Sequence, residues 1–344
     1  MKQNKVEKLL AGVLAVSLAM GVNVMPAFAA TDCIDPPPKP TPTYEDMESV
    51  TITKNYELTN GGTISPAETF HFTIERDDVT DAAEGVTPAN MPLPTIGTVT
   101  YAAGEAGSST KSKLITIDLP TYESVGVYTY IIHEVAGTSA GVTYYGDDIL
   151  LRVTVIEQDG KIRVAAVHTE DPEATGDDKK DSFDNIYSAG ELDIHKDVEG
   201  TLGDKSKYFE FTVSLTGDEG KTYAESYAVT GGSGNTNNPT SVEVVPGETR
   251  NYTFYLKDGD TMKIENLPYG VDYTVSETPA EGYITTSEGT EGEVDESVET
   301  AAFTNTKNGV IDTGVVLDNA PYLLTLSAAA GAGLLLTLRR RHQK

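Results

Sequence analysis

Residues 50–58 read VTITKNYEL and residues 192–200 read LDIHKDVEG, and these two stretches decide the fold. Apolar and polar residues alternate along both, and side chains two apart on a strand share a face. The lysine of each stretch, Lys54 or Lys196, falls on the apolar face. Because an isolated buried charge is costly, two inward lysines in matching strands need partners.

Each lysine is followed by an inward glutamate and an inward asparagine. Glu134 ends the alternating series YTYIIHE, and Glu277 ends YTVSE. Asn185 and Asn305 each follow a phenylalanine by two residues, in FDNIY and FTNTK. The glutamate follows the lysine by 80 residues in one region and by 81 in the other. A lone inward lysine is commonly an edge residue whose amine reaches water, but unrelated residues of that kind would not keep this spacing.

A lysine, a glutamate and an asparagine in an apolar interior are the groups that an intramolecular amide bond requires. The lysine amine must be neutral to attack the carboxamide and expel ammonia, and desolvation lowers a lysine pKa while it raises a glutamate pKa. Glu134 and Glu277 are then the catalytic residues: each takes a proton from the amine, polarises the asparagine carbonyl and protonates the leaving ammonia. Each domain acts on itself once, without enzyme turnover. The aromatic neighbours expected to desolvate the lysines are Phe70, Phe72, Phe209 and Phe211.

The segments around these residues resemble the Gram-positive (streptococcal-type) major pilin family, whose domains carry self-formed isopeptide bonds. The resemblance rests on TITKNYEL, YTYIIHEVAG and FDNIY, then LDIHKDVEG, YTVSETPAEGY and FTNTK, and spans most of residues 45–308. It implies tandem immunoglobulin-like β-sandwiches of the collagen-adhesin B (CnaB) type. It also implies that Lys54 is bonded to Asn185 and Lys196 to Asn305. Strand-like alternation between frequent turns independently predicts an all-β chain.

The two ends of the chain predict secretion and membrane retention. Three lysines within residues 2–8 precede an apolar run, and Ala27-Phe28-Ala29 supplies a cleavage site of the small-x-small type, which indicates a signal peptide. Residues 320–338 are largely apolar and three arginines follow them, which is typical of a membrane helix with its positive end inside.

Just before the apolar tail, the five residues Val310, Ile311, Asp312, Thr313 and Gly314 resemble a cell-wall sorting signal. By this resemblance a sortase cysteine attacks the carbonyl of Thr313 and releases the glycine side. The usual signal is Leu-Pro-x-Thr-Gly, so the isoleucine in place of proline leaves the sortase class open. The order of motif, apolar segment and basic tail favours sorting over the alternative of a plain membrane anchor.

These features divide the chain into five parts. We expect a signal peptide at 1–29, a proline-rich lead at 30–43, a first isopeptide-linked sandwich at 44–188, a second at 189–308, and a sorting motif, transmembrane helix and basic tail at 309–344. Cys33 is the only cysteine, so no disulfide forms within the chain, and a free thiol and an intermolecular disulfide both stay open for it.

Charge excludes one class of partner. The chain has 25 basic and 53 acidic residues, and removal of both processed ends leaves 18 and 51, a net charge of −33. Such a surface repels nucleic acid. The sequence has no phosphate-binding loop, nucleophile elbow or calcium-loop spacing, so we expect no cofactor and no metal site.

The sequence therefore predicts the structural shaft subunit of a sortase-assembled pilus, anchored in the cell wall at the surface of a Gram-positive bacterium. Its expected partners are a sortase, identical subunits, peptidoglycan or a wall precursor, and a host ligand. Thr313 would join a lysine of the next subunit, and Lys179 or Lys180 lies where family members place that acceptor; a solvated pair in an acidic loop is the alternative. The alternative functions are a monomeric wall-anchored adhesin for a host or extracellular ligand and an accessory pilus subunit.

Overall fold

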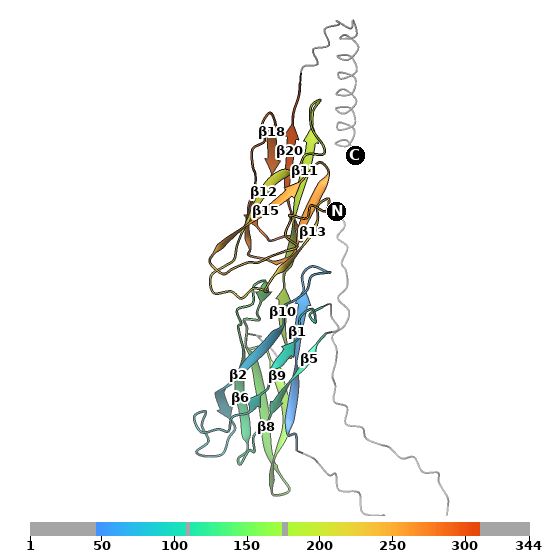
Figure 1. Ribbon diagram of the computed structural model, residues 1–344. Coiled ribbons are helices and arrows are strands. Elements are labelled where there is room, and N and C mark those ends of the chain that lie inside the picture. The colour runs from blue at the N-terminus through green and yellow to red at the C-terminus, as the bar shows by residue number, and fades with distance from the viewer. Residues whose placement is uncertain (1–45, 108–110, 174–177, 310–344) are drawn as a thin grey trace, which may run out of the picture. The chain divides into compact units, whose positions relative to one another are not determined.

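The computed structural model describes residues 46–107, 111–173 and 178–309, and its regular elements there are strands (Figure 1). The all-β class predicted from the sequence is confirmed. In these ranges no helix is long and apolar enough to cross a membrane. The expected signal peptide, the proline-rich lead, Cys33, the sorting motif and the membrane tail lie outside the described residues.

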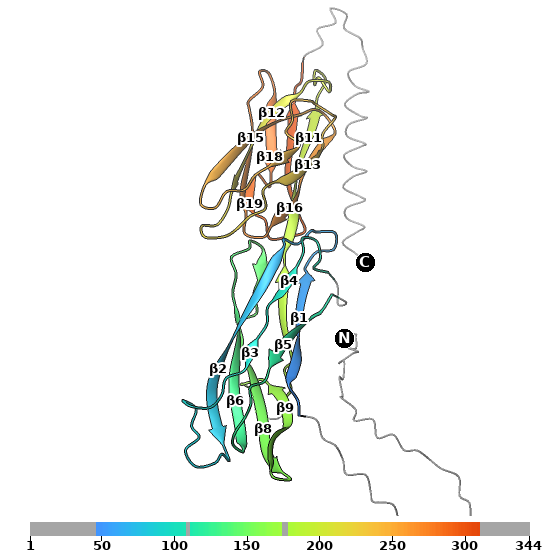
Figure 2. The ribbon, with the colours of Figure 1, turned by 60° about the horizontal axis from the view of Figure 1, so that its bottom comes forward.

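The first sandwich consists of two five-stranded sheets (Figure 2). One sheet has the order β3 (Thr95–Ile96), β5 (Lys113–Asp118), β1 (Ser49–Leu58), β10 (Ser182–Tyr187), β7 (Val142–Thr143). The other has the order β4 (Val99–Tyr101), β2 (Glu68–Thr80), β6 (Gly126–Val135), β8 (Ile149–Gln158), β9 (Lys161–Glu170).

The first and last strands of this sandwich are parallel neighbours. In the β1–β10 pair, Lys54 lies opposite Phe183 and Tyr56 lies opposite Asn185. The buried inward residues of β1 alternate with less buried ones, as the sequence pattern predicted. Between the sheets, the rings of Tyr56, Phe70 and Tyr101 meet edge to face at centroid distances of 5.1 to 5.8 Å, a favourable aromatic geometry.

The second sandwich packs a six-stranded sheet against a four-stranded one. The larger sheet has the order β14 (Ser241–Val242), β13 (Tyr227–Gly231), β16 (Asp260–Pro268), β11 (Ala189–Glu199), β20 (Val298–Thr306), β18 (Ile284–Glu288). The smaller has the order β15 (Thr249–Leu256), β12 (Phe209–Thr216), β17 (Asp272–Glu277), β19 (Glu291–Glu293).

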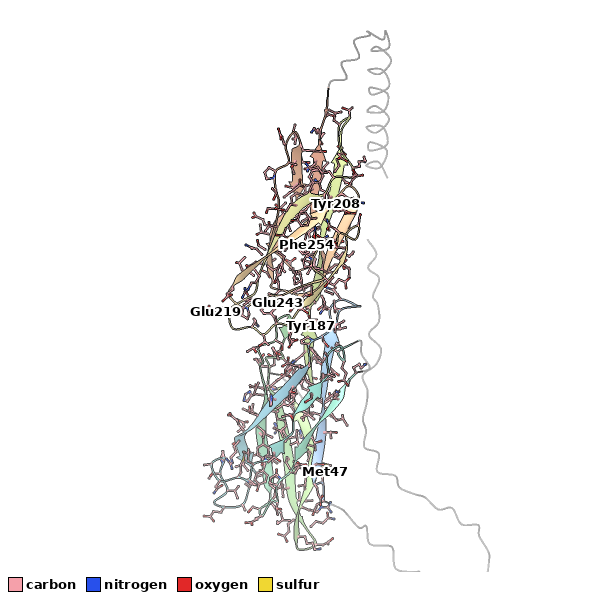
Figure 3. All side chains as sticks on the ribbon, in the orientation of Figure 1. Met47, Tyr187, Tyr208, Glu219, Glu243 and Phe254 are labelled. Carbon is pink, nitrogen blue, oxygen red and sulfur yellow. The ribbon has the colours of Figure 1, made fainter. Side chains whose placement is uncertain are left out.

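This sandwich repeats the parallel pairing of first and last strands. Lys196 of β11 lies opposite Phe303 of β20, and Val198 lies opposite Asn305. Its core is continuous across both sheets; Phe254, labelled in Figure 3, is fully buried in it, whereas Tyr208 is exposed. The same register in both sandwiches places a lysine and an asparagine on adjacent inward positions twice.

Candidate functional sites: two lysine, glutamate and asparagine trios

The first trio joins three buried side chains from three strands. Lys54 comes from β1, Asn185 from the neighbouring β10, and Glu134 from β6 in the opposite sheet. The side chains of Lys54 and Glu134 and the whole of Asn185 are 0% exposed. The lysine Nζ lies 2.7 Å from Glu134 Oε2, and Asn185 Nδ2 donates a hydrogen bond to Glu134 Oε1. One carboxylate therefore touches both the amine and the amide nitrogen.

Aromatic packing surrounds the amine of the first trio. Lys54 Nζ lies 4.4 Å from the ring centroid of Phe70, and it also donates to the carbonyl of Phe183 at 3.3 Å. Burial lowers the pKa of Lys54 to about 8, although the neighbouring Glu134 opposes that shift. Burial likewise raises the pKa of Glu134 above its usual range, against the opposing effect of Lys54. Both shifts favour a neutral pair, the state in which the amine is a nucleophile.

The second trio has the same geometry. Lys196 Nζ lies 2.8 Å from Glu277 Oε2, and Asn305 Nδ2 donates to Glu277 Oε1. The lysine and glutamate side chains are 0% and 2% exposed. Lys196 Nζ lies 4.6 Å from the ring centroid of Phe209, and burial lowers the pKa of this lysine too. The structure thus brings together all six residues that the sequence singled out, three at each site.

The two sites differ at the asparagine carbonyl. Asn185 Oδ1 accepts a hydrogen bond of 2.9 Å from the backbone N–H of Tyr145. Asn305 Oδ1 is buried, and among the described residues it has no hydrogen-bond partner. At both sites the hydrogen bond between asparagine and glutamate runs from the amide nitrogen, not to the carbonyl oxygen, so polarisation of the carbonyl by the glutamate stays a prediction. Each glutamate faces the amide nitrogen because a carboxylate oxygen can accept a hydrogen bond from the amide N–H.

A second difference is the charge beside each trio. Glu68 and Lys207 hold matching positions, two residues before the phenylalanine on which the trio lysine rests, Phe70 or Phe209. The negative charge of Glu68 adds to the effect of burial in raising the pKa of Glu134. Lys207 Nζ instead lies 5.2 Å from the ring centroid of Phe209. Neither residue was predicted from the sequence as part of a site, although alternation along β2 places Glu68 on the same face as Phe70.

A family model matches each of the two sandwiches. A model described as a Spy0128-like isopeptide containing domain matches residues 50–188, and one described as a domain of unknown function (DUF7601) matches residues 190–307. The chain is 30% identical over 305 residues to a pilin of Streptococcus pyogenes serotype M1, covering 83% of this chain and 88% of that protein. The chain belongs to the pilin family.

The chain is also similar to a solved structure and to an adhesin from the same organism. The crystal structure of the major pilin from Streptococcus pyogenes is 28% identical and covers 76% of this chain and 99% of its own, with a TM-score of 0.49. A pilus tip adhesin of Streptococcus pyogenes is 34% identical over 135 residues, which is 37% of this chain and 18% of the adhesin.

The two expected acceptor lysines of the pilin lie in different surroundings. Lys179 is exposed. Lys180 is half-buried, with Nζ 4.7 Å from the ring centroid of Tyr145 and 3.9 Å from the Asp184 carboxylate. Burial lowers the pKa of Lys180, but Tyr145 and Asp184 outweigh it and raise the pKa above the usual range. Lys180 is therefore held as a cation, and Lys179 has the more accessible amine. Thr313, their expected partner, lies outside the described residues.

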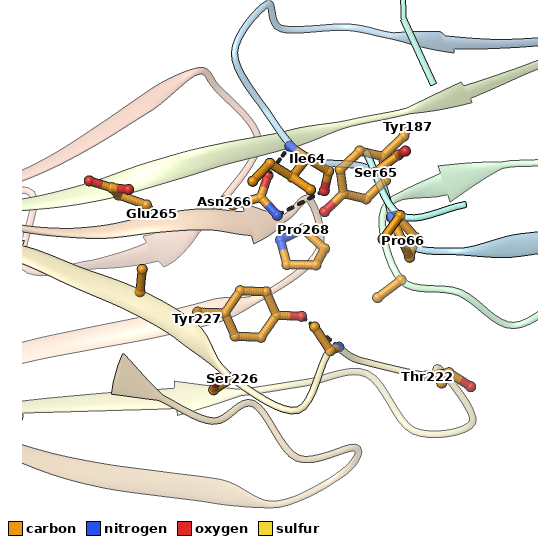
Figure 4. Close-up of a pocket in the computed structure, with 14 residues that line it drawn as sticks. Ile64, Ser65, Pro66, Tyr187, Thr222, Ser226, Tyr227, Glu265, Asn266 and Pro268 are labelled. Atoms are coloured by element: carbon orange, nitrogen blue, oxygen red, sulfur yellow. Dashed lines mark hydrogen bonds between the residues drawn. The ribbon is translucent and has the colours of Figure 1, made fainter. Parts of the chain in front are cut away.

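A pocket of about 300 Å³ lies apart from both trios (Figure 4). Its walls include Ile64, Tyr187, Tyr227 and Pro268, and the side chain of Asn266 bonds both to the N–H of Ile64 at 2.7 Å and to its carbonyl at 2.9 Å. None of the six trio residues lines this pocket. Its lining includes Glu265 and Asn266 but no lysine, so it lacks the amine that the amide chemistry needs.

Proposed function

We propose that each sandwich of this pilin forms its own isopeptide bond, Lys54 to Asn185 in the first and Lys196 to Asn305 in the second. One observation carries the proposal: at both sites the lysine Nζ and the asparagine Nδ2 bind the two oxygens of one buried glutamate. A carboxyl group in that position can move a proton from the amine that attacks to the nitrogen that leaves.

The reaction converts an amine and a carboxamide into a secondary amide and ammonia. The neutral lysine Nζ forms a bond to the asparagine Cγ, and one electron pair of the carbonyl moves onto Oδ1. The protonated glutamate gives its proton to Nδ2, and the Cγ–Nδ2 bond breaks as the carbonyl re-forms. The proton lost by Nζ returns to the glutamate, which ends as it began. Each site reacts once, so the pilin acts on itself and is not a turnover enzyme.

A digest tests this reaction directly. Branched peptides that join the Lys54 segment to the Asn185 segment, and the Lys196 segment to the Asn305 segment, are expected in mass spectra of the protease-treated pilin. Linear peptides alone from either region would contradict the proposal for that sandwich. Because the two bonds lie in different domains, one can fail without the other.

The bonds suit a protein that carries mechanical load. Each would join the first and last strands of a sandwich, which lie side by side in parallel. Tension applied to the two ends of a domain would then cross one covalent amide and bypass the hydrogen-bonded strands of the core. This favours a structural shaft subunit over a monomeric adhesin.

Assembly into a shaft would use the sorting motif. A sortase would cleave after Thr313 and join its carbonyl to a lysine of the next identical subunit, and the final polymer would be attached to peptidoglycan or its precursor at the surface of a Gram-positive bacterium. We place Lys179 first among the acceptors, because its amine is exposed while Lys180 is held as a cation by Tyr145 and Asp184. A host ligand remains an expectation from the family resemblance.

Covalent ladders on denaturing gels test the assembly step in cells that express the pilin with its sortase. Thr313→Ala and the double variant Lys179→Arg, Lys180→Arg are both expected to leave a single band, and the Lys179→Arg single variant to remove most of the ladder. Lys161→Arg, at the exposed first residue of β9, is the matched control and keeps the ladder. Ladders that persist in the double variant would overturn the acceptor assignment, and a single band from the wild type would favour the adhesin.

A further inference from the structure

The orientation of the Asn185 carboxamide is fixed from two sides. A backbone N–H can only donate, so the 2.9 Å contact from Tyr145 identifies the atom facing it as the oxygen Oδ1. The amide nitrogen is thereby turned toward Glu134 Oε1. This is the orientation in which the leaving nitrogen faces the proton donor and the carbonyl faces a separate hydrogen-bond donor.

Residues 136–145 comprise the loop after β6, the short strand β7 and the two residues that follow it, and their contacts hold Tyr145 in place. The Ser139 hydroxyl donates to the Glu68 carboxylate, and the Ser139 N–H donates to the Tyr144 hydroxyl at 3.2 Å. Gly137 packs under them: a Cβ there would collide with the Tyr144 hydroxyl and lie 3.0 Å from Glu68 Oε1. These contacts tie the loop to the start of β2.

The ring of Tyr145 adds a third attachment. It packs edge to face against Phe183 at a centroid distance of 5.3 Å. Phe183 lies two residues before Asn185 on β10, with both side chains directed inward and buried. The same residue therefore contacts the strand that carries Asn185 through its ring and the reacting carbonyl through its backbone.

Attack by Lys54 on Cγ moves an electron pair onto Asn185 Oδ1, so negative charge develops on the atom that Tyr145 N–H already contacts. A fixed donor at that position in a buried site stabilises the tetrahedral intermediate, and removal of one such donor typically slows acyl transfer about 10²- to 10³-fold. The glutamate cannot supply this contact, because its two oxygens face the amine and the amide nitrogen.

We propose that residues 136–145 form an oxyanion-stabilising loop for the first cross-link, in which Tyr145 N–H holds the Asn185 carbonyl and Glu68, Gly137, Ser139 and Tyr144 are the positioning residues. This inference rests on the proposed isopeptide bond between Lys54 and Asn185. In the second sandwich Asn305 Oδ1 has no such donor among the described residues, so the second site reacts without this assistance. The second site is therefore a built-in reference for the first.

The test replaces the Tyr145 peptide N–H with an ester oxygen. The full chain is made by cell-free translation with the α-hydroxy analogue of tyrosine at position 145, samples are quenched over time, and both cross-links are quantified by mass spectrometry of a digest. The Lys54–Asn185 bond is expected to form about 100-fold more slowly than in the wild type, while the Lys196–Asn305 bond forms at its wild-type rate. The same ester at Tyr122, a buried tyrosine of the first sandwich outside residues 136–145, is the matched control and should leave the Lys54–Asn185 rate unchanged.

A second pair of variants covers the case in which the ester prevents folding. Ser139→Ala removes the hydroxyl that binds Glu68 and is expected to slow the first cross-link about tenfold through misplacement of the loop. Ser139→Thr keeps a hydroxyl and is expected to restore the rate, which a loss of packing alone would not explain. In both variants the rate at the second site is unchanged.

The outcomes separate this inference from the proposed function. An unchanged rate at the first site with the Tyr145 ester, or equal rates for Ser139→Ala and Ser139→Thr, would overturn the role of the loop and leave the isopeptide bond standing. A wild-type chain without a Lys54–Asn185 bond would overturn both. Equal slowing of the two sites in the ester variant would assign the effect to global folding and also overturn the loop's specific role.

Discussion

The two sandwiches contain the same reactants in different surroundings. In both, parallel pairing of the first and last strands sets the lysine beside the asparagine, and a strand of the facing sheet supplies the glutamate. The distances from lysine Nζ to glutamate Oε2, 2.7 and 2.8 Å, are nearly equal. The carbonyl environment differs, because Asn185 has a donor in Tyr145 and Asn305 has no partner among the described residues. Strand register thus fixes the reactants, whereas loops adjust how fast they react.

This difference gives each domain a role as the other's control. A change that acts on the shared chemistry should affect either site in the same way, and a change that acts on a loop should affect one site alone. Site-resolved rates within one chain can therefore separate the two kinds of effect without comparison between preparations.

The largest effect is expected from loss of the glutamate carboxyl. Glu134→Gln is expected to slow the Lys54–Asn185 bond by at least about 10²- to 10⁴-fold, because glutamine keeps the shape but cannot transfer a proton. Glu277→Gln should do the same at Lys196 and Asn305. Site-resolved mass spectrometry of the two variants measures this. A rate of bond formation at the altered site close to that of the wild type would show that the carboxyl is not the proton carrier.

Loss of its own bond should lower the free energy of unfolding of each domain by nearly the same amount. The bonded residues are 131 positions apart in the first sandwich and 109 in the second, and chain entropy gives about 5 kcal/mol for both loops. Asn185→Ala and Asn305→Ala are therefore expected to lower the free energy of unfolding of their own domains nearly equally in denaturant titrations. Asn251→Ala, on the exposed face of β15, is the control and should have little effect. If only one of the two asparagine variants lost stability, the isopeptide bond would be present in that domain alone.

The rate at the first site should fall on both sides of a plateau as pH changes. The reactive pair holds one proton between Lys54 and Glu134. Above the pKa of Lys54, lowered by burial to about 8, that proton is lost and none remains for the leaving nitrogen. Below the pKa of Glu134, raised by burial, both groups are protonated and no neutral amine is present. Because the two groups are coupled, the midpoints of the acidic and basic limbs of the profile are properties of the Lys54–Glu134 pair and not of either residue alone.

Time courses across pH measure this profile. A rate that continued to increase well above pH 8 would show that the free amine alone limits the reaction, and that the glutamate proton is not needed.

The smallest effect is expected from the charge that distinguishes the two surroundings. Glu68→Gln removes a negative charge that raises the pKa of Glu134, so the acidic limb at the first site should move to lower pH. Glutamine can still accept the hydrogen bond from Ser139, which limits the change to electrostatics. Lys207→Gln, at the matching position of the second sandwich, is the control and should leave the first-site profile unchanged. If the acidic limb of the pH profile did not move, the charge of Glu68 would not contribute to the raised pKa of Glu134.

Much of this arrangement was predictable from the sequence because strands expose their register. Alternation identified the inward lysines, glutamates and asparagines, and the nearly equal lysine-to-glutamate spacings indicated two related sites. The Tyr145 contact was not predictable, because a backbone N–H leaves no mark in the residue pattern. The orientation of the two carboxamides was not predictable either. The sequence led us to expect that the glutamate would contact the asparagine carbonyl, whereas in the structure it contacts the amide nitrogen. Glu68 was accessible to the same alternation argument but had no matching acid in the second region.

The intact mass of the chain from residue 30 to residue 313 tests the central claim most directly. Each isopeptide bond removes one ammonia, about 17 Da, a covalent change that noncovalent packing cannot imitate. The account predicts a mass lower than the sequence value by two ammonias, and by one ammonia in Glu134→Ala or Glu277→Ala. A mass equal to the sequence value would leave Lys54 and Lys196 as buried ion-pair partners and contradict the account.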